Sequence, residues 1–97
     1  MTQPSLPLKS TSWVAISGAC GGLGKAFAVE CAIRGYNLFL TDLNPVLLDT
    51  LANSLRQAYG CRVLTHPCDL TDPAARAALF ERMRAEQLRF WALINVA

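Results

Sequence analysis

The fold is decided by a glycine-rich stretch between a short apolar run and a predicted helix, Ser17-Gly18-Ala19-Cys20-Gly21-Gly22-Leu23-Gly24. The run before it, Trp13 to Ser17, is typical of a buried strand, and Gly22 to Arg34 is predicted to be a helix that ends at Gly35. Glycines let the backbone turn tightly and approach a ligand closely. Free amides at a helix start, assisted by the helix dipole, attract phosphate. The stretch therefore predicts a phosphate site, with a pyrophosphate as the expected ligand.

The spacing of the glycines distinguishes between three kinds of phosphate loop. A P-loop that ends at Gly24 would need its first glycine at Ala19. The fingerprint G-x-G-x-x-G/A starts at Gly22 but ends on Phe27. The pattern G-x-x-x-G-x-G fits, with Gly18, Gly22 and Gly24 as its glycines. A glycine-rich turn without a ligand remains the alternative.

The rest of the chain alternates strand and helix. Further apolar runs predict strands over 37–41, 62–65 and 91–95. The pairs Asn44-Pro45 and Asp72-Pro73 combine a capping residue with a first-turn proline, and they predict helices to Tyr59 and to about Leu88. The second of these helices is expected to carry Leu79, Phe80 and Met83 on one side. Near-continuous apolar strands alternating with helices predict an α/β fold, a partial Rossmann-type doubly wound parallel sheet of order 3-2-1-4 with helices on both faces.

Composition narrows the possible functions. The 97 residues are 53% hydrophobic with a net charge of +2, which favours a packed domain over a disordered chain. The basic residues are scattered, so no nucleic-acid partner is expected. No apolar run approaches the roughly 20 residues of a membrane span. The four cysteines lack C-x-x-C spacing, so we expect no metal site, reduced thiols and a cytoplasmic location. Residues 1–12 are predicted to be a flexible leader.

The glycine stretch resembles the Thr-Gly-x-x-x-Gly-x-Gly loop of the short-chain dehydrogenase/reductase family, with Ser17 in place of Thr. The resemblance extends over nearly the whole chain after the leader, in order and spacing. In that family, an acidic residue at the position of Asp42 binds the adenosine ribose and implies NAD rather than NADP. An NADP-preferring member would be expected to carry Arg or Lys where Leu43 and Cys20 stand, although Lys25 lies just beyond the loop. A simple strand-end turn is the alternative for Asp42.

Two later segments also match the family. Cys68-Asp69-Leu70 lies where an Asp meets the adenine amino group, and a turn before the Asp72 cap is the alternative. Leu93 to Ala97 resembles the segment Asn-Asn-Ala-Gly, with Asn95 at its first position and Val96 departing at its second. Asn95 is expected to join the central strands, to line the ribose or simply to end a strand. The cofactor-binding residues that the resemblance implies are Ser17, Gly18, Cys20, Gly21, Gly22, Leu23, Gly24, Asp42, Leu43, Cys68, Asp69, Leu70, Asn95 and Ala97.

The catalytic residues of the family are not found in this chain. The family uses a Ser and a Tyr-x-x-x-Lys pair, whereas Leu40 follows Tyr36 and Val63 follows Tyr59 at that spacing. His66 is expected to be a strand-end residue rather than a base. Residues 13–97 thus resemble the cofactor-binding half of an NAD(P)-dependent oxidoreductase, truncated before its catalytic half and inactive alone. A non-catalytic dinucleotide-binding or interaction module is the alternative.

Two further expectations concern partners and reactivity. A longer form would act on an alcohol or carbonyl substrate. The apolar strand from Trp91 to Val96 would be an exposed edge here, which predicts a homo-oligomer or a complementing fragment. Cys20 lies near a helix start, where thiolates are stabilised, so it is expected to be alkylated faster than the other cysteines unless it only fills space in the loop.

Overall fold

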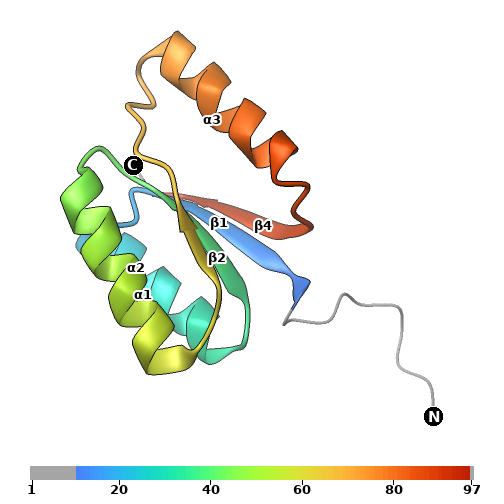
Figure 1. The fold of residues 1–97 in the computed structure, drawn as a ribbon. Helices are drawn as coiled ribbons and strands as arrows, with labels where there is room; N and C mark the ends of the chain where they lie inside the picture. Colours follow the sequence, from blue (N-terminus) through green and yellow to red (C-terminus); the bar gives the residue numbers. More distant parts are fainter. Residues whose placement is uncertain (1–10, 97) are drawn as a thin grey trace.

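The computed structural model describes residues 11–96, which form a single four-stranded sheet with three helices (Figure 1). The elements are β1 (Trp13–Ser17), α1 (Gly22–Ile33), β2 (Asn37–Thr41), α2 (Pro45–Tyr59), β3 (Val63–Thr65), α3 (Pro73–Ala85) and β4 (Phe90–Asn95). All neighbouring strands are parallel, in the order β3-β2-β1-β4. The predicted fold class and strand order are confirmed.

Helices cover both faces of the sheet, but unequally. Figure 1 shows α1 and α2 on one face and α3 alone on the other. Every residue of β1 and β2 is buried, because alternate side chains of a strand enter opposite layers. On the first face, Val14, Ile16, Leu38 and Leu40 pack with alanines of α1 and leucines of α2. On the second, Trp13, Ala15 and Phe39 pack against Leu79 of α3.

The ends of α1 and α2 follow from local residues. Gly35 adopts a φ of 91°, and the amides of Gly35 and Tyr36 return to carbonyls of the last turn of α1, as in a Schellman motif. The Asn44 side chain accepts from the amides of Val46 and Leu47 at 3.0 and 3.1 Å, and thereby caps α2. Gly60, with a φ of 69°, ends α2 as predicted.

The third helix departs from the prediction at its end. It ends at Ala85 instead of about Leu88, because Gln87 takes a left-handed φ of 53° and turns the chain towards β4. Leu79, Phe80 and Met83 line one groove between α3 and the sheet, so they lie on one side of the helix as predicted. Leu79 is buried, Met83 is half-buried and Phe80 is exposed.

The start of the described chain is tied to the sheet. Ser12, which the sequence placed in the leader, is buried, and its carbonyl accepts from the Asn37 amide at 3.0 Å. Residues 1–10 of the predicted leader, and Ala97, lie outside the described residues. Within 11–96, no helix combines the length and the apolar character that a bilayer crossing requires.

Candidate functional site

The glycine stretch folds back on itself between β1 and α1. Gly18 has a φ of 65°, and its carbonyl accepts from the Gly21 amide at 3.2 Å. A Cβ on Gly18 would lie 2.2 Å from the Val96 carbonyl oxygen, and one on Gly24 would lie 2.0 Å from the Gly18 carbonyl oxygen. Both contacts are with backbone and far inside van der Waals distance, so the fold of the loop itself requires glycine at these two positions.

Gly22 is a glycine for a different reason. A Cβ placed there would have nothing within 4 Å, and the residue is not among those with a positive φ. Neither sterics nor backbone conformation within the described chain excludes a side chain. Gly22 instead keeps open the space in front of the first turn of α1, which suits a ligand that approaches the backbone closely.

The first turn of α1 also lacks a cap. No side chain among residues 11–96 accepts a hydrogen bond from the start of α1, whose capping position is Gly21. Amides of a first helical turn have no acceptor within their own helix. These amides, with the positive end of the helix dipole, form a place where an anion is stabilised.

Asp42, at the end of β2, connects three segments of the site. Its Oδ2 accepts from the Cys20 amide of the glycine loop at 2.8 Å, and its Oδ1 accepts from the Leu43 amide at 2.6 Å. Its main-chain carbonyl accepts from the Cys68 amide after β3 at 2.9 Å. The loop, the end of β2 and the end of β3 therefore meet around one carboxylate at the carboxyl ends of the strands, where open α/β sheets bind ligands.

Two adjoining grooves meet at Gly18, Asp42 and Val96. The loop groove, about 490 Å³, is also lined by Cys20, Gly21, Gly22, Leu23 and Leu47. The β2–β3 groove, about 210 Å³, is also lined by Thr41, Leu43, Cys68, Asp69, Leu70 and Thr71. Most of the residues that the resemblance implied thus line a continuous rim with a carboxylate at its middle.

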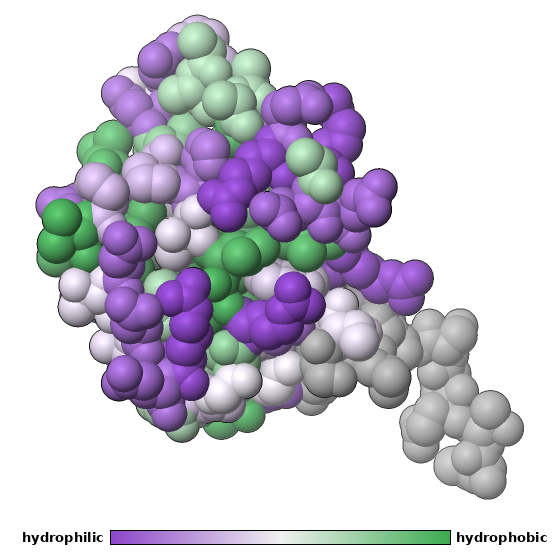
Figure 2. Space-filling model, in the orientation of Figure 1, coloured by the Kyte–Doolittle hydropathy of each residue, from purple (hydrophilic) through white to green (hydrophobic). Residues whose placement is uncertain are grey.

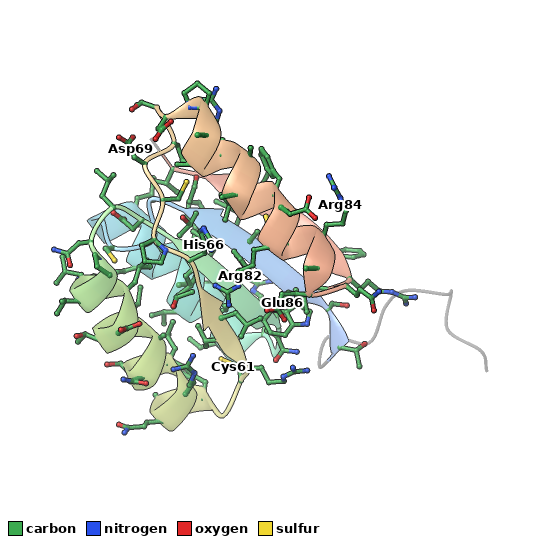
Figure 3. All side chains as sticks on the ribbon, turned by 45° about the horizontal axis from the view of Figure 1, so that its top comes forward. Cys61, His66, Asp69, Arg82, Arg84 and Glu86 are labelled. Carbon is green, nitrogen blue, oxygen red and sulfur yellow. The ribbon has the colours of Figure 1, made fainter. Side chains whose placement is uncertain are left out.

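Asp69 lies in the turn between β3 and α3, at the rim (Figure 3). Its Oδ1 accepts from the Thr71 amide at 2.9 Å and from the Thr71 hydroxyl at 2.6 Å. These hydrogen bonds hold the pKa of the Asp69 carboxyl below its usual value, so it stays ionised into acid. An ionised, exposed carboxylate at this place accepts hydrogen bonds from an amino group that enters the β2–β3 groove.

Ser17 and Asn95 lie away from this rim. The Ser17 hydroxyl donates to Asn95 Oδ1 and so joins β1 to β4, one of the roles considered for Asn95. Both residues line the α3 groove, an apolar hollow of about 300 Å³ between α3 and the sheet, instead of the two rim grooves. Gly24 lines none of the three grooves and lies buried beneath Gly18. Ala97 lies outside the described residues.

Four rim residues were missed from the sequence, Thr41, Leu47, Thr71 and Val96. Thr41 is buried, and its hydroxyl has no hydrogen-bond partner among the described residues. Thr41, Thr71 and Val96 each adjoin a predicted site residue, so extension by one position would have found them. Leu47 lies in the first turn of α2, is half exposed and lines the loop groove.

The stabilised thiolate expected at Cys20 is not found, whereas its alkylation rate relative to the other three cysteines, whose pKa burial also raises, stays a prediction. Burial raises the pKa of the Cys20 thiol, the Asp42 carboxylate raises it further, and Lys25 opposes both. The thiol is therefore more protonated than an ordinary cysteine at neutral pH. Burial, followed by the nearby Arg82, lowers the pKa of His66, which leaves it neutral at pH 7. His66 directly follows Thr65, the last residue of β3.

The family model of the short chain dehydrogenases matches residues 12–97. The very-long-chain 3-oxoacyl-CoA reductase of Anas platyrhynchos is 31% identical over 86 residues, which are 87% of this chain and 27% of that protein. The solved short-chain dehydrogenase of Sphingobium yanoikuyae, in complex with NADPH, is 41% identical with a TM-score of 0.71, over 75% of this chain and 28% of that one.

A solved 7beta-hydroxysteroid dehydrogenase is 30% identical with a TM-score of 0.83, over 89% of this chain and 32% of that one. The chain thus spans 27%, 28% and 32% of the lengths of these three proteins. The family match covers the sheet, the three helices and both rim grooves. The chain belongs to the short-chain dehydrogenase/reductase family of oxidoreductases.

Proposed function

We propose that this chain is the dinucleotide-binding portion of an NAD(P)-dependent oxidoreductase, and that it holds the cofactor pyrophosphate at the start of α1. The observation that carries the proposal is the open space at Gly22 in front of an uncapped helix end. The residues fit the cofactor along the rim. Amides of the first turn of α1 would face the pyrophosphate, Asp42 the adenosine ribose and Asp69 the adenine.

We propose NAD(H) as the preferred cofactor. Asp42 lies between the two grooves, where its carboxylate would accept hydrogen bonds from ribose hydroxyls and repel a 2′-phosphate. Leu43 and Cys20 supply no positive charge beside it, and Lys25 is the basic residue that follows the glycine loop. The NADPH complex of the Sphingobium yanoikuyae relative supports the opposite preference, so the two cofactors must be compared directly.

We propose that the substrate is an alcohol or carbonyl compound and that it would be bound in a longer form of the protein. The names of the curated relatives describe reduction of a 3-oxoacyl group, which supports an alcohol or carbonyl substrate. The nicotinamide would supply the hydride. Neither Tyr36 nor Tyr59 is followed by Lys at the family spacing, so we propose that these 97 residues alone bind cofactor without turnover.

Titration of the purified chain with NADH and with NADPH, followed by cofactor fluorescence, tests this function. The proposal predicts saturable binding of both cofactors, with the smaller dissociation constant for NADH. Absence of saturable binding with either cofactor would refute the dinucleotide site. A smaller dissociation constant for NADPH would leave the site standing and refute the assignment of NAD.

An interaction module is the second candidate function, and it is favoured by the contrast between the two edge strands of the sheet, β3 and β4. At the β3 edge, Arg56 of α2 and Arg82 of α3 donate to the carbonyls of Val63 and Thr65, while neighbouring positions of β3 bond to β2. Figure 3 shows Arg82 reaching from α3 towards β3, and Figure 2 shows strongly hydrophilic residues on both sides of the hydrophobic strip between α2 and α3. This edge is closed to further strands.

Within residues 11–96, the β4 edge carries none of these protections. β4 is six residues long and contains neither charge nor proline, and its side chains Trp91 and Leu93 are 49% and 66% exposed. We propose that two copies pair through β4, since antiparallel pairing of two identical edges is self-complementary. Sedimentation of the wild type and of Leu93→Lys tests this. A dimer that dissociates in the variant is expected, and a wild-type monomer at all concentrations would refute it.

A further inference from the structure

Both oxygens of the Asp42 carboxylate accept hydrogen bonds from backbone amides of the chain itself. One oxygen accepts from the Cys20 amide, which lies 22 positions earlier in the chain, and the other accepts from the Leu43 amide. A second tie between the same segments joins the Ala19 amide to the Thr41 carbonyl at 3.2 Å. The hydrogen bond from Cys20 is the shorter of the two ties and the only one of them that involves a charge.

The glycine loop needs such a tie. A loop that contains Gly18, Gly21 and Gly22 loses much conformational freedom when it takes a single shape. The loop has no side-chain cap among the described residues, and its other fixed points are the turn at Gly18 and the hydrogen bond from the Ala19 amide to the Thr41 carbonyl. A hydrogen bond from a backbone amide to a carboxylate is roughly twice as strong as one between neutral groups. Asp42 thus fixes the loop at Cys20, directly before the α1 capping position.

We propose that Asp42 is a positioning residue for the glycine loop, which sets the direction of the first-turn amides of α1 before an anion arrives. This role is distinct from any contact between Asp42 and the ribose. The inference rests on the proposed function only in naming the anion as a dinucleotide pyrophosphate. The fixed loop itself is a property of the unliganded chain.

Inorganic pyrophosphate separates this role from the others, because it carries no ribose for Asp42 to bind. Removing a negative charge near the anion should strengthen pyrophosphate binding if Asp42 acts only through its charge. Loss of the tie to Cys20 should weaken binding, because the free loop must be ordered at the cost of binding free energy. The two accounts therefore predict opposite signs for Asp42→Ala.

The unliganded chain is tested first, by amide hydrogen exchange measured with NMR. In Asp42→Ala, exchange at the Cys20 amide should accelerate about tenfold or more, the loss expected for a hydrogen bond to a charged group. Asp42→Asn keeps one acceptor, so its exchange rate at the Cys20 amide should lie between those of the wild type and of Asp42→Ala. This variant also provides the test if the alanine variant does not fold. Asp49→Ala, which removes an exposed carboxylate of α2, should leave Cys20 unchanged. Exchange at Cys20 within twofold of wild type in both Asp42 variants would overturn the proposal.

Pyrophosphate binding is measured next, by calorimetry on the same variants. We expect Asp42→Ala to weaken pyrophosphate binding severalfold and Asp49→Ala to leave it unchanged. Equal or tighter binding by Asp42→Ala would overturn the positioning role. If the wild type binds neither pyrophosphate nor NADH, the proposed function fails, and the exchange measurement alone then decides whether Asp42 fixes the loop.

Discussion

The three helices of this chain begin in two different ways. α2 and α3 begin with a side chain that accepts backbone amides, Asn44 in one and Asp72 in the other, each followed by a proline. α1 begins at Gly21 without a side-chain cap among the described residues, and its first residue, Gly22, faces open space. The uncapped end contributes backbone to the groove beside Asp42 at Gly21 and Gly22, whereas the capped start of α2 contributes the Leu47 side chain.

The difference between capped and uncapped helix starts indicates that α2 and α3 begin with residues that stabilise the fold, whereas we propose that α1 begins with residues that leave room for a ligand. A cap contributes about 1 kcal/mol to a helix, so an end without one gives up stability. The glycine stretch gives up that contribution where phosphate would supply the missing acceptor. Within the stretch, a Cβ at Gly18 or Gly24 would clash with backbone, and a Cβ at Gly22 would meet no atom within 4 Å, so we propose that Gly22 keeps the helix end accessible to phosphate. Substitutions at these positions should therefore change either the free energy of unfolding or the affinity for NADH.

Gly24→Ala should give the largest effect. Alanine normally favours a helix by about 1 kcal/mol over glycine, but here its Cβ would meet the Gly18 carbonyl oxygen at 2.0 Å. We expect the clash to dominate and to lower the free energy of unfolding by about 3 kcal/mol. Urea denaturation measures it. A variant as stable as the wild type would show that the loop does not depend on this contact.

Removal of a cap should cost less and leave the ligand site intact. Asn44→Ala and Asp72→Ala should each lower the free energy of unfolding by about 1 kcal/mol, because each leaves first-turn amides without their acceptor. NADH affinity of the folded variants should be unchanged. If either variant lost affinity while remaining folded, the division between capped and binding helix ends would be wrong.

Supplying α1 with its own cap should sharpen the comparison. Gly21→Asp places an acceptor at the capping position, where a Cβ meets only the Gly18 carbonyl oxygen at 3.6 Å. Stability should rise by about 0.3 kcal/mol, while NADH affinity falls because the carboxylate competes with phosphate. Gly21→Ala is the matched control, with space filled but no acceptor added. Equal affinities for the aspartate and alanine variants would count against competition at the helix end.

The smallest effect concerns Cys20, which lies between the loop and Asp42. Because burial and Asp42 raise the pKa of the thiol, alkylation by iodoacetamide at pH 7 should be no faster than for a cysteine in an unfolded peptide. The rate should increase as the pH rises past the ordinary value for cysteine. Lys25→Gln should slow it, since Lys25 lowers that pKa. Mass spectrometry after timed labelling gives the rates. Faster labelling of Cys20 than of the peptide cysteine at pH 7 would contradict the raised pKa of the thiol.

Local features of the sequence predicted the fold well. The pairs Asn44-Pro45 and Asp72-Pro73 marked helix starts, and Gly35 and Gly60 marked helix ends, because caps and left-handed turns depend on neighbouring residues. The end of α3 was misplaced because no glycine marks it, and Gln87 adopts the left-handed conformation instead.

The site was predicted in outline, and its division of roles was not. The hydrogen bond from Cys20 to Asp42 and the bond from Ser17 to Asn95 join residues far apart in the chain, so spacing alone does not reveal them. The sequence likewise does not show which glycines are sterically required, because this depends on the atoms that surround each of them in the fold. The place of Cys20 near a helix start predicted a stabilised thiolate. Burial and the Asp42 charge raise the pKa of the thiol instead, and both come from tertiary contacts that the local sequence does not reveal.

Gly22→Ala tests the central claim most directly, with NADH titration and urea denaturation on the same preparation as the wild type. A Cβ at Gly22 has room in the folded chain, so the free energy of unfolding should equal or exceed that of the wild type. The same methyl group should occupy the space for the pyrophosphate and weaken NADH binding by about tenfold or more. Wild-type NADH affinity in a stable Gly22→Ala chain would contradict the assignment of this helix end as the phosphate site.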